Sequence, residues 1–135
     1  MGDKKIVAFV CTGNSCRSQM AEGFAKKYGN DILEIYSAGT NPSSSVNQTA
    51  IEVMKEKGID ISNQYPKTLE QIPNKVDILI TMGCGVVCPF LPNKLQEDWG
   101  LEDPVGKPIE FFREIRDTIE KKVIELVERV RRGKI

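Results

Sequence analysis

An eight-residue polar segment, 11–18, stands between an apolar run and a helix-like pattern, and it constrains the fold of this chain more than any other feature. The run 6–10 is apolar throughout, and after the segment Met20, Phe24 and Tyr28 recur at helical spacing. A strand that passes through a tight loop into a helix directs several backbone N–H groups toward one point, where the helix dipole adds positive potential. The segment therefore predicts an anion-binding loop at the carboxyl end of a strand.

Within this loop, Cys11 and Arg17 are separated by five residues. The positive potential of the loop favours the thiolate of Cys11, which is the nucleophilic form. The planar guanidinium of Arg17 can bind two oxygens of a tetrahedral anion. Ser18 is interpreted either as a polar residue of the first helical turn or as a hydroxyl donor to the sulfur, and the two are compatible. The residues expected to hold the oxyanion are Thr12, Gly13, Asn14, Ser15, Cys16, Arg17 and Ser18.

Composition narrows the possible functions. The chain has no histidine, which excludes Cys–His and Ser–His–Asp catalytic groups and leaves carboxyl groups or tyrosines as proton donors. Lysine plus arginine and aspartate plus glutamate number 19 each, so we expect no nucleic-acid or membrane-surface partner. The start of the chain has no apolar signal core, and no run is long enough to span a membrane. We expect a cytoplasmic monomer in which residues 1–135 form one domain.

A second cysteine pair, Cys84 and Cys88, follows the third apolar run of the chain. Glycines near its start allow this segment to rearrange. One interpretation is a pair of buried structural thiols. The other is a relay. One thiol attacks a sulfur or adduct at Cys11, and the second then takes over the disulfide by exchange so that an external reductant can reach it. The spacing does not decide which cysteine attacks first. Cys11 and Cys16 lie inside the anion loop, so we expect no four-thiolate metal site.

Asp103 precedes Pro104 in a turn between the second cysteine pair and the end of the chain. Proline restricts the backbone of the residue before it, which helps to aim this carboxyl group. Because histidine is absent, Asp103 is the preferred proton donor to a departing oxygen, and Glu102 is the local alternative.

The rest of the pattern alternates strands and helices. We expect strands at 33–37 and 76–82, a helix at about 47–57 and a long amphipathic helix near the C-terminus. The apolar face of that last helix is formed by Phe112, Ile115, Ile119, Val123, Leu126, Val127 and Val130. This order predicts a doubly wound α/β domain, in which ligands bind at the carboxyl ends of the strands. Cys11 and Cys84 would then lie at one edge of the sheet.

Taken together, these motifs resemble the arsenate reductases of the low-molecular-weight phosphatase-like, thioredoxin-coupled family. The resemblance is carried by residues 10–23, 36–39 and 99–104 and by the pair Cys84 and Cys88, and it runs nearly end to end. It implies a four-stranded parallel sheet flanked by helices. The fourth strand would lie near residues 96–99, where the sequence pattern alone indicates none.

The resemblance also implies a reaction. Cys11 attacks arsenate held by the loop amides and Arg17, while Asp103 protonates the leaving hydroxyl. Cys84 then attacks Cys11 and releases arsenite, and Cys88 attacks Cys84 to leave a redox-active Cys84–Cys88 disulfide. Thioredoxin reduces this disulfide, so no bound cofactor is implied. The relay segment is shorter than in well-known members, which keeps a mycothiol-like small thiol as an alternative reductant.

Some relatives bind a monovalent cation through residues that match Asn14, Glu22 and Ser37 together with a further acid. At the position of that acid this chain has Lys67. A lysine ammonium can take the place of the ion, so we expect no potassium dependence.

Two other functions fit part of the pattern. A low-molecular-weight protein tyrosine phosphatase would use the same loop and acid, and weak phosphatase activity is a possible side reaction. Such phosphatases usually have aromatic residues after the Asp-Pro pair, where this chain has Val105 and Gly106. A redox sensor or oxyanion-binding module is the second alternative, in which Cys11 and Cys16 form a disulfide and no substrate is turned over.

Overall fold

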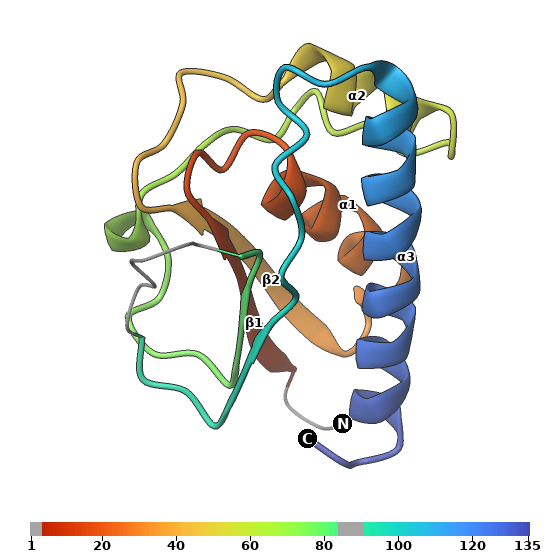
Figure 1. Ribbon diagram of the computed structural model, residues 1–135. Coiled ribbons are helices and arrows are strands. Elements are labelled where there is room, and N and C mark those ends of the chain that lie inside the picture. The colour runs from red at the N-terminus through yellow and green to blue at the C-terminus, as the bar shows by residue number, and fades with distance from the viewer. Residues whose placement is uncertain (1–3, 84–90) are drawn as a thin grey trace.

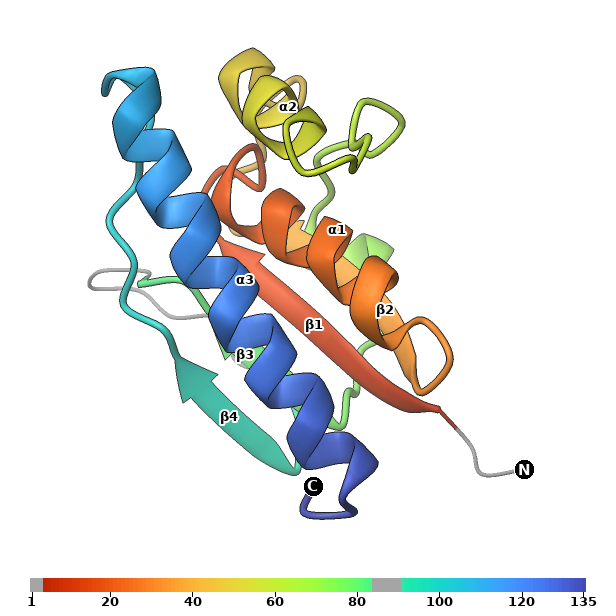
Figure 2. The same ribbon diagram turned by 90° about the vertical axis from the view of Figure 1, so that its right-hand side faces the viewer.

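The computed structural model describes residues 4–83 and 91–135. Four parallel strands form one sheet in the order β2-β1-β3-β4 (Figures 1 and 2). The strands are β1 (Lys5–Cys11), β2 (Leu33–Gly39), β3 (Ile78–Thr81) and β4 (Leu95–Asp98). The helices are α1 (Arg17–Gly29), α2 (Gln48–Lys55) and α3 (Ile109–Arg131), with a short 3-10 helix, η1 (Leu69–Gln71). The parallel four-stranded sheet that the resemblance implied is confirmed, and β4 lies within one residue of the expected 96–99.

The two faces of the sheet are covered differently. Helices α1 and α3 lie side by side over one face, in front of the strands in Figure 2. Alternation along β1 sends Val7 and Phe9 into the core beneath these helices. Ala8 and Val10 point the other way, into a smaller apolar cluster that includes Ile72 next to η1. β1 therefore buries side chains on both faces of the sheet, which is why its sequence is apolar throughout 6–10.

Two elements are shorter than the sequence pattern indicated. β3 covers 78–81 rather than 76–82, and the carboxylate of Asp77 accepts the backbone N–H of Ile6 at 2.7 Å where a strand partner would otherwise bind. Helix α2 ends at Lys55 rather than near 57. Gly58 then adopts a φ of 75°, as expected of a residue that reverses the chain after a helix.

The register of the sheet brings the carboxyl ends of its strands to one edge. Cys11 pairs with Gly39, and Thr81 pairs with Asp98. A Cβ atom on Gly39 would lie 2.5 Å from the carbonyl oxygen of Thr12, so only glycine allows the end of β2 to approach the loop after β1 this closely. This edge is where the topology predicts a ligand site.

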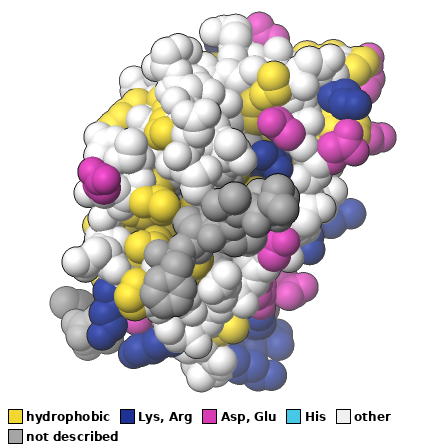
Figure 3. Space-filling model, turned by 60° about the vertical axis from the view of Figure 1, so that its left-hand side comes forward, with side chains coloured by type: hydrophobic (Ala, Val, Ile, Leu, Met, Phe, Trp, Pro, Cys, Tyr) yellow, Lys and Arg dark blue, Asp and Glu magenta, His cyan; other side chains and the backbone are white. Residues whose placement is uncertain are grey.

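Charged side chains do not form one large patch on the side of the molecule shown in Figure 3. Uncharged groups cover much of that side, and Lys and Arg side chains lie mainly toward its lower edge. Among the described residues, no helix has the length and apolar character needed to cross a bilayer.

Candidate active site

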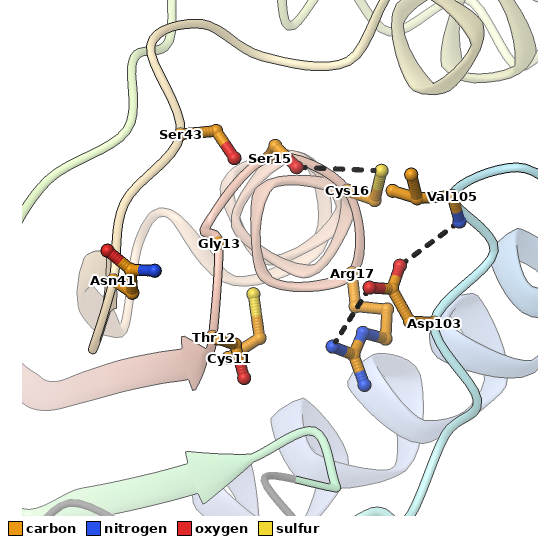
Figure 4. A pocket seen from close by; sticks show the side chains of 10 residues that line it. All are labelled: Cys11, Thr12, Gly13, Ser15, Cys16, Arg17, Asn41, Ser43, Asp103 and Val105. Atoms are coloured by element: carbon orange, nitrogen blue, oxygen red, sulfur yellow. Dashed lines mark hydrogen bonds and ion pairs between the residues drawn. The ribbon is translucent and has the colours of Figure 1, made fainter.

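A cavity of about 260 Å³ opens at the carboxyl edge of the sheet. It is lined by Cys11, Thr12, Gly13, Ser15, Cys16, Arg17, Asn41, Ser43, Asp103 and Val105. Figure 4 shows Cys11 at the end of β1, with its sulfur directed into the loop, and Arg17 beside Asp103. The structure thus brings the predicted nucleophile, guanidinium and carboxyl group into one pocket.

Asn14 determines the shape of the anion loop. Its φ of 50° lies in the left-handed region, which asparagine tolerates better than most residues. This conformation aims its backbone N–H at the sulfur of Cys11, at 3.1 Å. Its side-chain Oδ1 accepts the backbone N–H of Lys67 at 2.8 Å, and its Nδ2 donates to Ser18 Oγ at 2.7 Å. Asn14 is fully buried, so these bonds hold the loop from inside the protein.

Ser18 acts on the same sulfur. Its Oγ lies 2.8 Å from Cys11 Sγ. Because that oxygen already accepts from Asn14, its own proton is available for the sulfur. Two donors therefore converge on Cys11, and hydrogen bonds to a charged form stabilise it. Ser18 also lies in the first turn of α1, so the geometry fits both interpretations of this residue.

Arg17 begins helix α1 and is almost completely buried. Its Nη1 donates to the carbonyl oxygens of Met82 at 2.7 Å and Leu101 at 2.8 Å. Its Nη2 faces Asp103 Oδ2 at 3.8 Å. One nitrogen thus anchors the guanidinium to the protein, and the other lies at the pocket beside the acid.

Asp103 is the better placed of the two candidate acids. Its Oδ1 accepts the backbone N–H of Val105 at 3.1 Å, which orients the carboxyl group on its turn. Glu102 does not line the pocket, and its carboxylate faces the ammonium of Lys107 at 3.4 Å. The geometry therefore favours Asp103 as the proton donor.

Cys16 is held as a neutral thiol. Burial is the main cause that raises its pKa to about 12. Ser15 Oγ donates to the Cys16 sulfur at 3.8 Å, and in Figure 4 that sulfur points toward Val105, away from Cys11. Near neutral pH, Cys16 does not compete with Cys11 as a nucleophile.

This difference predicts selective alkylation. We expect iodoacetamide at pH 8 to modify Cys11 and to leave Cys16 unmodified in the folded protein, because a thiol with a pKa of about 12 has almost no thiolate at that pH. Peptide mass spectrometry measures both sites. In urea the burial is lost, and Cys16 should then react at the rate of an ordinary cysteine. Equal modification of the two residues in the folded state would contradict this assignment.

A buried ion pair lies behind the anion loop. Lys67 Nζ lies 3.7 Å from Glu22 Oε1, and Ser37 Oγ donates to the same carboxylate oxygen. Lys26 pairs with the other oxygen at 2.6 Å. Burial lowers the pKa of Lys67 below its ordinary value, and the Glu22 carboxylate partly counteracts this shift. The Lys67 ammonium thus faces the Glu22 carboxylate, which is consistent with its expected role in place of a cation.

We therefore expect activity and melting temperature to be the same in potassium and sodium chloride at equal ionic strength.

Substitution Lys67→Met should lower the free energy of unfolding by about 1–3 kcal/mol, because it removes a partner of buried Glu22. This variant should also acquire a response to potassium. Lys26→Met is the control, since it removes the other partner of Glu22. That partner is about half exposed and water can replace it, so its loss should cost less than ~1 kcal/mol. A potassium-specific rise in the wild-type protein would contradict the role of Lys67.

Not every predicted site residue can be placed. Cys84 and Cys88 lie outside the described residues, so their proposed relay stays a prediction. Asn41 and Ser43 also line the pocket, although no motif in the sequence indicated them. Both residues follow the carboxyl end of β2. Because ligands bind at such strand ends, their position in the sequence could have identified them. No group of three His, Cys, Asp or Glu side chains within 4–83 and 91–135 is arranged to hold a metal ion.

Comparison with known proteins gives consistent results. Residues 6–87 and 84–134 match the family model of low molecular weight phosphotyrosine protein phosphatases. Arsenate reductase 2 of Staphylococcus haemolyticus (strain JCSC1435) is 48% identical over 122 residues, which cover 87% of this chain and 92% of that protein. A solved arsenate reductase in its phosphate-binding state has a TM-score of 0.85 and 44% identity, over 93% of this chain and 98% of the other. A thioredoxin-dependent arsenate reductase of Corynebacterium glutamicum has a TM-score of 0.80 and 32% identity, over 98% of this chain and 64% of the other.

Proposed function

The chain belongs to the low molecular weight phosphotyrosine protein phosphatase family, and within this family we propose that it reduces arsenate to arsenite with electrons from thioredoxin. The observation that carries the proposal is the sulfur of Cys11, which has two hydrogen-bond donors and lies in a pocket shared with Arg17 and Asp103. The described lining of that pocket has Val105 and no aromatic ring, which fits a small inorganic oxyanion better than an aryl phosphate. A relative that is 48% identical is named an arsenate reductase, which supports arsenate as the oxyanion.

The first step uses described residues. Arsenate is held by the loop amides of residues 12–18 and by the free side of the Arg17 guanidinium, in the positive potential of the α1 N-terminus. The Cys11 thiolate attacks arsenic and forms an S–As bond. One As–O bond breaks, and Asp103 supplies the proton that lets the oxygen leave as water.

The later steps use the second cysteine pair. Cys84 attacks the sulfur of Cys11, the electron pair of the S–As bond passes to arsenic, and arsenite leaves with arsenic reduced from the pentavalent to the trivalent state. Cys88 then attacks Cys84, which releases Cys11 and leaves a Cys84–Cys88 disulfide. Thioredoxin returns two electrons to that disulfide. In this scheme thiols supply all electrons, no bound cofactor is required, and the protein works as a monomer in the cytoplasm.

The Cys88→Ser variant tests this scheme. With arsenate, thioredoxin and thioredoxin reductase, we expect the wild-type protein to form arsenite continuously. The variant should form about one equivalent and then stop, because it ends as a Cys11–Cys84 disulfide. Arsenite release and disulfide-mapping mass spectrometry measure the two outcomes. Without reductant, the wild-type protein should end with Cys84–Cys88.

The alternatives give different results in the same assay. A tyrosine phosphatase would hydrolyse an aryl phosphate at the same rate with or without Cys88 and would form no arsenite. A sensor or binding module would bind oxyanions and turn over neither substrate. A Cys11–Cys16 disulfide as the main product of arsenate treatment would overturn the assigned relay.

A further inference from the structure

One peptide unit joins a carboxylate to the guanidinium of the active site. The backbone N–H of Gly83 donates to Asp98 Oδ1 at 2.7 Å. The carbonyl oxygen of Met82, in the same peptide unit, accepts from Arg17 Nη1 at 2.7 Å. In a trans peptide the N–H and the C=O point in opposite directions, so an acceptor that fixes one also aims the other.

Asp98 also binds the segment that provides the second carbonyl group. Its Oδ1 also accepts the backbone N–H of Gly100 at 3.1 Å. The next residue in the chain, Leu101, provides the other carbonyl oxygen that binds Arg17 Nη1, at 2.8 Å. A single carboxylate oxygen therefore holds both backbone segments whose carbonyl groups anchor Arg17.

The two segments are also in direct contact. Gly83 has a φ of 85°, and a Cβ atom built on it would lie 3.2 Å from both the N and the O of Leu101. A side chain at position 83 would strain the backbone and separate the segments. Packing keeps the two segments close. The hydrogen bond from Gly83 to Asp98 also orients the Met82 carbonyl group, and the bond from Gly100 holds the turn that precedes the Leu101 carbonyl group.

We propose that Asp98 is a positioning residue for oxyanion binding, which acts through the Met82–Gly83 peptide and the Gly100–Leu101 turn to aim the guanidinium of Arg17. The hydrogen bonds at the two ends of the Met82–Gly83 peptide run in the same sense, from Asp98 through N–H and C=O to the guanidinium, and hydrogen bonds arranged in such a chain strengthen one another. Asp98 itself does not line the pocket, so it touches no substrate. The proposal rests on the anion-binding role of Arg17 in the proposed function.

The expected effect is moderate. Asp98 lies at the end of β4 and is exposed, so water can replace part of its bonding in a variant. We expect Asp98→Ala to weaken the binding of inorganic phosphate about three- to tenfold, which corresponds to the loss of exposed hydrogen bonds that water partly replaces. Asp98→Asn keeps an Oδ1 acceptor in the same place and should bind phosphate within about twofold of the wild-type protein.

The test uses the complete, reduced chain and phosphate alone. The rate at which iodoacetamide modifies Cys11 is followed by peptide mass spectrometry at increasing phosphate, and the concentration that gives half protection reports affinity. Glu52→Ala, which removes an exposed carboxylate on α2 that does not line the pocket, controls for the loss of one negative charge. Melting temperatures control for stability.

A double-mutant cycle separates positioning from a general structural role. If Asp98 acts through Arg17, Asp98→Ala should weaken phosphate binding in the wild-type background and have no further effect in Arg17→Ala. Wild-type affinity in Asp98→Ala, an equal loss in Asp98→Asn, or a full additional loss in the Arg17→Ala background would each overturn the proposal. Absence of phosphate protection in the wild-type protein would instead count against the proposed function.

Discussion

Replacement of Cys11 by serine is expected to lower the rate of arsenite formation by about 10⁴-fold or more, as is usual when a covalent nucleophile is removed. A serine hydroxyl does not ionise near neutral pH, even with Asn14 and Ser18 directed at it. An oxygen in place of the sulfur also cannot form the disulfide that transfers electrons to arsenic. The variant should still bind phosphate, because the loop amides and Arg17 remain.

Arsenite release under thioredoxin-coupled turnover measures this effect, and phosphate binding by calorimetry shows that the pocket is intact. Cys16→Ala is the matched control, since it removes the other cysteine of the loop and keeps the backbone amide of residue 16. We expect it to keep activity within about tenfold, with a loss of stability of roughly 1–2 kcal/mol from the buried gap. Arsenite formation by Cys11→Ser above one hundredth of the wild-type rate would refute the role of Cys11.

The second large effect is expected for Arg17→Lys. Lysine keeps the positive charge but cannot bind an anion with one nitrogen while another is anchored to two carbonyl groups. We expect kcat/KM for arsenate to fall about 10²- to 10³-fold, the range seen when a transition-state donor is removed. The unfolding free energy should fall by about 1–3 kcal/mol, because the carbonyl groups of Met82 and Leu101 lose a buried donor.

Steady-state kinetics and chemical denaturation measure these two losses separately. Arg113→Lys is the control substitution. Arg113 lies on the exposed side of α3, where it pairs with Glu56 at 2.8 Å, and its replacement should change kcat/KM by less than about twofold. If Arg17→Lys kept kcat/KM within threefold of the wild-type value, the guanidinium would not be the oxyanion receptor described above.

The local signals in the sequence were strong enough to predict the centre of the fold. Residues 6–10 and 11–18 by themselves predict a strand that passes through a tight loop into a helix, and this arrangement is confirmed by β1 and α1. β4 is different, because its residues, Leu-Gln-Glu-Asp, carry one apolar side chain and alternate between half-buried and exposed at the edge of the sheet. An edge strand that buries so little has no hydrophobic pattern to detect. Only the resemblance to known proteins indicated it.

The site was predictable where chemistry is local and not where it depends on distant contacts. The spacing of Cys11 and Arg17 follows from one loop and one helical turn. The contacts of Arg17 with Met82 and Leu101 join residues 65 and 84 positions away, and a linear pattern does not contain them. The left-handed turn at Asn14 was also not foreseen, because asparagine adopts ordinary conformations in most loops.

Asn14 sets a limit on how this protein can be engineered. The same residue directs its backbone at the reactive sulfur and uses its amide to join the loop to Lys67 and Ser18 in the interior. Glycine at position 14 would adopt the positive φ easily, but it would lack the side-chain amide. Most other residues would have a side chain but would adopt this φ only with strain. Laboratory evolution toward heat tolerance should therefore leave this position unchanged and find its gains on the exposed surface of α3.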